Sequence, residues 1–202
     1  MLIALISGHI AALLPECLRA QIHRTVFMAV NNANWQHVPS EIRELARQQW
    51  LEAIDTIKEE GYFPPSASIF GCTLPAGCGM EWTEAISGDD KRYYAGNPKV
   101  AHFYTSWEPT NEIISLVFSD DVTIFGQSEP TAVDAWCAVH TRAKITRVMV
   151  SPKDYGTSAV GHVGMFREGQ IRLWEVIGDI ILYGRLPKKG RFRRWNLGKV
   201  RL

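Results

Sequence analysis

The sequence has few cysteines, no long apolar run and almost no net charge, and each shortage excludes a class of protein. Four cysteines in 202 residues are too few for a disulfide framework, and none has the spacing of a zinc site. No apolar stretch is long enough to cross a bilayer, and the apolar residues 1–14 lack the charged start of a signal peptide. A net charge of +1 provides no general attraction to nucleic acid or to an anionic membrane. We therefore expect a cytoplasmic protein with reduced thiols, no metal, no nucleic-acid partner and no membrane partner.

Acidic residues are also absent after Asp179, where lysines and arginines accumulate. This composition is typical of a solvated segment, and we predict that residues 185–202 form a disordered basic tail. Phe192 and Trp195 interleave with the arginines, so weak binding to RNA or another anionic surface is the alternative for this tail.

Short apolar runs alternate with helical patterns along the rest of the chain. Residues 24–30, 113–118 and 145–150 are compact apolar runs suited to strands buried on both faces. A helical pattern lies between the first two, starting at Ser40 as the N-cap and stopping at Gly61. Further helices are predicted from about residue 128 and around Ile171, Trp174, Ile177 and Ile181. Strands that alternate with helices predict an α/β fold with a mostly parallel sheet flanked by helices.

The segment from residue 62 to residue 106 lacks this regularity. Glycine and proline punctuate it, and it is rich in Trp, Tyr and Phe that need something to pack against. We predict a helix-and-loop cap over residues 35–107, inserted into a core made of residues 1–34 and 108–184.

Two short motifs carry most of the functional information. The apolar run 113–118 continues into Ser119, Asp120 and Asp121, and the sequence GHVGMFR at 161–167 places His162 among small residues before an apolar helical run. A strand that ends in a carboxylate, followed by a helix, a strand and a loop histidine, is the order of the last two triad members in α/β-hydrolases. The chain resembles an uncharacterised family of predicted α/β-hydrolases of the serine-hydrolase type. The resemblance is carried, in order, by residues 8–16, 61–64, 74–77, 81–82, 119–121, 161–167 and 173–174.

The resemblance implies a partial α/β-hydrolase fold that acts on a small ester or acyl substrate without a cofactor or metal. His162 would be the general base, and the alternative is a loop histidine that caps the following helix. Only one of Asp120 and Asp121 can face the histidine, because successive strand-end residues point in opposite directions. We prefer Asp121 as the acid because it directly precedes Val122, and two turn-forming aspartates are the alternative.

The nucleophile is the member of the triad that the sequence does not supply clearly. Aligned on Gly8, the serine position of the family's elbow falls on Leu5, which leaves Ser7 as the candidate. Leu5 and His9 then occupy flanking positions where the strained turn needs small residues. We therefore expect a chain truncated on its N-terminal side, and whether it is an active enzyme stays open. The alternative function is an inactive hydrolase-derived fragment that acts as a binding module, with a homodimer formed through an exposed sheet edge.

Aromatic residues are the candidates for substrate binding. Trp82 and Tyr104 of the cap, together with Phe166 beside the histidine motif, would line an apolar pocket for the acyl or alcohol group. A satellite core inside the cap is the alternative for the first two.

Overall fold

The chain alternates short strands with helices along most of its length. The computed structural model describes residues 2–4, 12–22, 24–30, 38–65, 73–80, 101–107, 112–121, 130–138, 140, 142–162 and 164–196. In chain order the elements are β1 (Leu2–Ala4), α1 (Glu16–Arg19), β2 (Thr25–Met28), α2 (Ser40–Glu60), β3 (Tyr62–Phe63), β4 (Leu74–Pro75), α4 (Ala101–Ser106), β5 (Ile113–Phe118), α5 (Pro130–Ala138), β6 (Lys144–Val150), α6 (Ile171–Tyr183) and β7 (Arg191–Asn196). Two 3₁₀ turns, η4 (Pro152–Tyr155) and η5 (Gly164–Phe166), separate β6 from α6.

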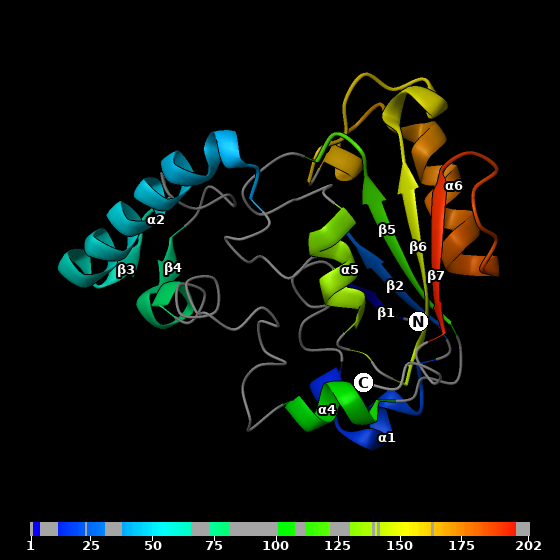
Figure 1. The fold of residues 1–202 in the computed structure, drawn as a ribbon, viewed down its shortest axis with the longest axis horizontal. Coiled ribbons are helices and arrows are strands. Elements are labelled where there is room, and N and C mark those ends of the chain that lie inside the picture. Colours follow the sequence, from blue (N-terminus) through cyan, green and yellow to red (C-terminus); the bar gives the residue numbers. More distant parts are fainter. Residues whose placement is uncertain are drawn as a thin grey trace.

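Within the described residues, the main sheet has the strand order β1-β2-β5-β6-β7 (Figure 1). The first four strands run parallel, and β7 pairs antiparallel with β6. Helix α5 covers one face of the sheet and α6 covers the other (Figure 1). The prediction of an α/β protein with a mostly parallel sheet between helices is therefore confirmed.

Alternation along the strands divides the core into two apolar layers. All six residues of β5 are buried, as expected for a strand covered on both faces. Side chains on one face pack against Val133, Trp136 and Cys137 of α5; these side chains include Phe27, Ile113, Val117, Ile145 and Met149. Side chains on the other face pack against Leu173, Ile177 and Ile180 of α6; these include Val26, Ile114, Leu116, Phe118 and Val148.

The ends of helix α2 match the predicted boundaries, although the start is made differently. Pro39 is the N-cap residue and Ser40 is the first helical residue, with no side-chain capping hydrogen bond, so the prediction of Ser40 as N-cap is wrong. Pro39 has φ −50° and an extended ψ of 136°, so the helix begins at the next residue, Ser40, without a capping side chain. At the other end Gly61 has φ +76° and donates its N–H to the Ile57 carbonyl at 2.9 Å, which stops the helix as predicted.

The basic segment after residue 184 is not a disordered tail up to residue 196. Residues 191–196 form β7, in which Arg193 lies directly opposite Arg147 of β6. Asp134 of α5 forms an ion pair with Arg147 at 2.9 Å and a second one with Arg193. The free edge of β6 and this shared carboxylate stabilise a strand whose composition alone suggested a solvated tail.

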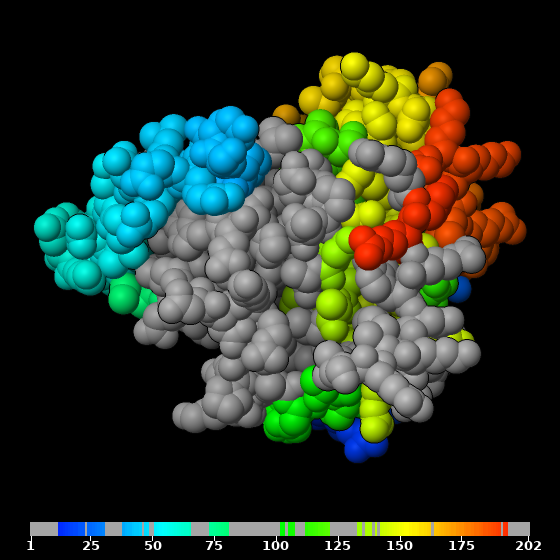
Figure 2. All heavy atoms as spheres, in the orientation of Figure 1, coloured from blue at the N-terminus to red at the C-terminus, as the bar shows by residue number. Residues whose placement is uncertain are grey.

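The region predicted as a cap divides into two parts. Helix α2 packs against β3, which pairs only with β4 among the described strands, and these elements form a lobe at one end of the molecule (Figures 1 and 2). By contrast, Trp107 is buried in the α5-side core and Phe103 packs against it. The predicted cap boundary at residue 107 is therefore wrong, because α4 and the residue after it belong to the packing of the main sheet. None of the described helices is long and apolar enough to cross a membrane.

A histidine lies inside the α5-side core. His140 follows α5 and is fully buried, with its ring centroid 4.8 Å from that of Trp136 and 5.7 Å from those of Phe27 and Trp107. Its Nδ1 lies 3.2 Å from the Trp136 carbonyl oxygen. Burial lowers the pKa of the His140 imidazole from its ordinary 6.5 to about 4.

His140 should make the stability of the fold depend on pH. The folded state keeps the ring neutral down to about pH 4, whereas the unfolded chain binds a proton near pH 6.5, so stability falls as the pH drops between these values. We expect about 2 kcal/mol to be lost from this group between about pH 7 and about pH 4.5. Urea unfolding of the wild type and of His140→Phe at both pH values measures it. The loss should be smaller by that amount in His140→Phe and unchanged in His102→Phe, which alters an exposed histidine.

Candidate functional site

The two functional motifs meet because β5 and β6 end side by side. Phe118, the last residue of β5, is the register partner of Val150, the last residue of β6. The N–H of Ser119 donates to the Val150 carbonyl at 2.9 Å, so the pairing continues one step beyond the strands. The segments that carry the two acids and the histidine therefore leave the sheet at the same edge.

A tight turn presents both acids directly after β5. The N–H of Asp121 donates to the carbonyl of Phe118 at 3.1 Å, which closes a turn over residues 118–121. Asp121 is only 3 % exposed, and Asp120 is partly buried. A carboxylate as buried as Asp121 requires polar partners to offset its desolvation.

The loop after β6 is fixed to the core on both sides of His162. Val160 and Met165 are buried in the α6-side layer, with Met165 inside the turn η5. Between them Gly161 has φ +59°, a left-handed conformation that favours glycine. A Cβ added at Gly161 would meet nothing within 4 Å, and one at Gly164 would have its nearest neighbours at 4.0 Å. Glycine is thus needed at 161 for its backbone angle, and close packing against a neighbouring atom requires glycine at neither position.

His162 and Asp121 form a hydrogen-bonded pair. The distance from Nδ1 of His162 to Oδ2 of Asp121 is 2.9 Å, and the two side chains are 14 % and 4 % exposed. An ionised carboxylate can only accept, so in the neutral form of the imidazole the Nδ1 atom carries the proton and Nε2 the lone pair. This arrangement can take a proton from a hydroxyl at Nε2 while the carboxylate stabilises the resulting imidazolium.

Asp120 contacts the same loop by a different route. Its Oδ2 accepts the N–H of Val160 at 2.7 Å and the N–H of Gly161 at 3.1 Å. The neighbouring acids therefore do different things, since Asp121 binds the imidazole and Asp120 binds the backbone just before it. The sequence showed only that one of the two would face the histidine.

The remaining predicted site residues are distributed unevenly. Ser7 and Trp82 lie outside the described residues. Strand β1, which ends at Ala4, is parallel to β2, so β1 ends at the same edge of the sheet as β5 and β6. Helix α4, which contains Tyr104, lies at the opposite end of the sheet, where the strands begin (Figure 1), so the structure does not bring Tyr104 to His162.

Phe166 lies four residues after His162, in the turn η5. It is 48 % exposed, and its ring centroid is 6.0 Å from that of Trp174 in α6. The two rings form an exposed aromatic pair that connects the histidine loop to α6. A role for Phe166 in binding substrate stays a prediction.

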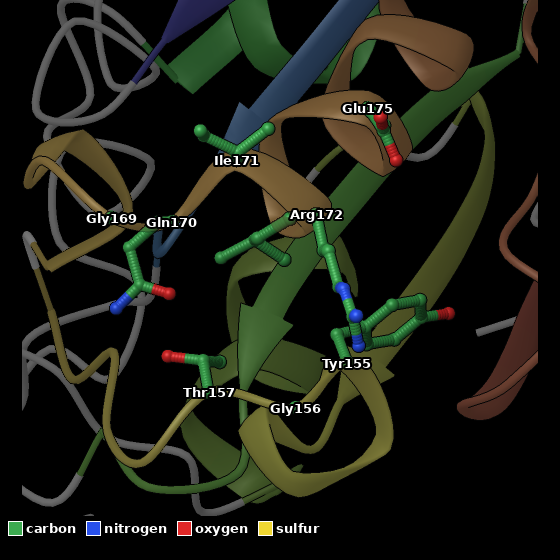
Figure 3. Close-up of a pocket in the computed structure, with 9 residues that line it drawn as sticks. Tyr155, Gly156, Thr157, Gly169, Gln170, Ile171, Arg172 and Glu175 are labelled. Carbon is green, nitrogen blue, oxygen red and sulfur yellow. The ribbon is translucent and has the colours of Figure 1, made fainter.

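A pocket of about 450 Å³ lies between residues 155–157, at the end of η4, and the start of α6 (Figure 3). Arg172 extends from the first turn of α6 toward Tyr155 and Gly156, with its Nη1 3.1 Å from where a Cβ on Gly156 would be. Gln170 donates its side-chain amide to the Ala159 carbonyl at 3.0 Å, which connects the pocket wall to the histidine loop. Sequence reasoning missed this pocket, for which Gly156 and Gly169 were the only local signal. Its lining contains none of the predicted site residues: Tyr155, Gly156, Thr157, Gly169, Gln170, Ile171, Arg172, Leu173 and Glu175.

No group of three or more His, Cys, Asp or Glu side chains that could hold a metal ion occurs among the described residues.

The two glycines of the histidine loop should respond differently to alanine. Gly161→Ala places a side chain at φ +59° and should destabilise the fold by about 1–2 kcal/mol. Gly164→Ala has an ordinary backbone angle and room for the methyl group, so it should be neutral or stabilise by up to about 1 kcal/mol. Urea unfolding of the two variants measures both effects, and equal effects would contradict a left-handed Gly161.

Comparison with family models, with curated proteins and with solved structures finds no match for this chain. We therefore base the assignment of chemistry on the contacts of His162, Asp121 and Asp120 and on the motifs that surround them.

Proposed function

We propose that this chain is a serine-type hydrolase of small ester or related acyl substrates, built on part of an α/β-hydrolase fold. The single observation that carries the proposal is the 2.9 Å contact between His162 Nδ1 and Asp121 Oδ2. Both side chains are largely buried, and they come from two neighbouring loops at the carboxyl edge of a parallel sheet. An acid that holds a histidine in one tautomer is the supporting half of a nucleophile–histidine–acid triad.

The strand order supports the same assignment. Ser7 follows β1, Asp121 follows β5 and His162 follows β6, which gives the chain order serine, acid, histidine of α/β-hydrolases. In the sheet β1, β2, β5 and β6 are neighbours that run parallel, so β1, β5 and β6 all end at the same edge. Open parallel sheets bind their ligands at the carboxyl ends of the strands.

In the proposed reaction the Ser7 hydroxyl oxygen attacks the acyl carbon while Nε2 of His162 takes the hydroxyl proton. The imidazolium then gives that proton to the departing alcohol as the tetrahedral intermediate collapses to an acyl-enzyme. Water repeats both steps and releases the acid, again with His162 as base and then as acid. Asp121 stays ionised throughout and stabilises the imidazolium.

The alternative is a hydrolase-derived binding module without activity, and one observation favours it. Leu5 and His9 flank Ser7 where a strained nucleophile turn needs small residues. In that case the acid–histidine pair is a structural clamp between two loops, and a partner or second copy would pair with a free strand at the edge of the sheet.

A fluorophosphonate distinguishes the two functions because it phosphonylates only an activated serine. We expect intact-mass measurement to show one adduct on the wild type and none on Ser7→Ala or His162→Ala. Asp121→Asn should slow adduct formation by about 10⁴-fold, because the amide favours the wrong tautomer of the imidazole.

Matched controls are Ser158→Ala, an exposed serine of the histidine loop, and His102→Ala, an exposed histidine of α4. Both should label like the wild type. Absence of an adduct on folded wild-type protein would refute the hydrolase and leave the binding module. An adduct that persists in Ser7→Ala but not in His162→Ala would move the nucleophile to another residue.

A further inference from the structure

We propose that Asp120 is the positioning residue of His162. In this role Asp120 is a hydrogen-bond acceptor that fixes the backbone before the histidine, so that the imidazole meets Asp121 in one tautomer. The contribution of Asp120 to catalysis rests on the proposed function, whereas its hydrogen bonds to the loop do not. Asp120 itself contacts backbone amides and none of the reacting groups.

The contacts of Asp120 converge on one oxygen. The N–H groups of Val160 and Gly161 both point at Oδ2, at 2.7 and 3.1 Å. Two successive amides that share one anion form a small concave site of the kind that binds anions, and their bonds to a carboxylate are stronger than bonds between neutral groups. The left-handed Gly161 turns the chain at this point, and the next residue is His162.

The turn over residues 118–121 thus binds both the backbone of the histidine loop and the ring of His162. Asp121 closes this turn through its bond to the Phe118 carbonyl and binds the imidazole at 2.9 Å. Asp120, its neighbour, binds the backbone one and two residues before the imidazole. Three hydrogen bonds from adjacent acids therefore locate His162 relative to the end of β5. Without Asp120 the backbone just before His162 would be fixed only by the apolar packing of Val160 and Met165 on either side of it.

Stability alone explains Asp120 poorly. Its Oδ1 is buried and has no hydrogen-bond partner among the described residues. Leaving a buried carboxylate oxygen without a partner is unfavourable, so a neutral acceptor would suit a purely structural clamp better. The Asp120 side chain instead places one acceptor oxygen between the N–H groups of Val160 and Gly161.

The test separates the position of the acceptor from its charge. Asp120→Asn keeps an oxygen in place without the charge, Asp120→Glu keeps the charge but moves it by one methylene, and Asp120→Ala removes both. ¹⁵N NMR of the His162 ring reports its tautomer and its titration in each variant. We expect one Nδ1–H tautomer in the wild type and in Asp120→Asn, and a mixture of tautomers in Asp120→Glu and Asp120→Ala.

Fluorophosphonate labelling gives a second readout. Misplacing the base by about 1 Å should slow labelling by about 10²-fold in Asp120→Glu and Asp120→Ala, and Asp120→Asn should stay within about tenfold of the wild type. The control is Glu168→Ala, which removes an exposed acid from the same loop and should change neither readout.

Two outcomes would overturn the role of Asp120. One is a single unchanged tautomer in Asp120→Glu, the variant that keeps the proposal testable if Asp120→Ala does not fold. The other is loss of the tautomer in Asp120→Asn to the same extent as in Asp120→Glu. The ring NMR needs no nucleophile, so a wild type that takes no fluorophosphonate refutes the hydrolase while the positioning role is still decided by the tautomer.

Discussion

The site depends on the parallel pairing of β5 with β6 and on the fact that both strands end together. Their last residues, Phe118 and Val150, are register partners, and the bond from Ser119 to Val150 extends the pairing into the loops. Because side chains alternate along a strand, a slip of one residue would move the apolar residues of both core layers to the wrong face. Packing against α5 and α6 therefore fixes the register, and the register brings together Asp121 and His162, which are 41 residues apart in the chain.

Beyond the strand ends, the two acids hold His162 through different contacts. Asp121 determines which ring nitrogen carries the proton, and Asp120 determines the position of the backbone from which the His162 side chain extends. The buried residues Val160 and Met165 keep the loop on the core at both sides, so the hydrogen bonds need only set its fine position. Apolar packing of the loop and hydrogen bonds to the two carboxylates thus restrict the conformations of the imidazole before any substrate is bound.

The sequence predicts the parts of this structure whose signals are local. The apolar run 113–118 is the strand β5, because a strand buried on both faces leaves an uninterrupted apolar pattern, and the stop at Gly61 follows from its left-handed angle. The contact of His162 with an acid after β5 could be expected from the order of motifs, but the separate contact of Asp120 could not, since it depends on the turn of the loop at Gly161.

Strand β7 was missed because pairing with β6 and the carboxylate of Asp134 override an unfavourable local composition. Trp107 was assigned to a cap because its partners Phe27 and His140 are distant in sequence.

The same contacts bear on how a nucleophile after β1 would reach the base. Three strand spacings, about 14 Å in all, separate β1 from β6, which is too far for a hydrogen bond between residues standing directly above those strands. The ring of His162, however, is bound to a residue that follows β5, the strand next to β6 on the side of β1. The bonds from Asp120 to Val160 and Gly161 draw the backbone of the loop in the same direction. The acid pair therefore orients the histidine and also holds its loop beside the end of β5, which lies nearer to β1 in the sheet than β6 does.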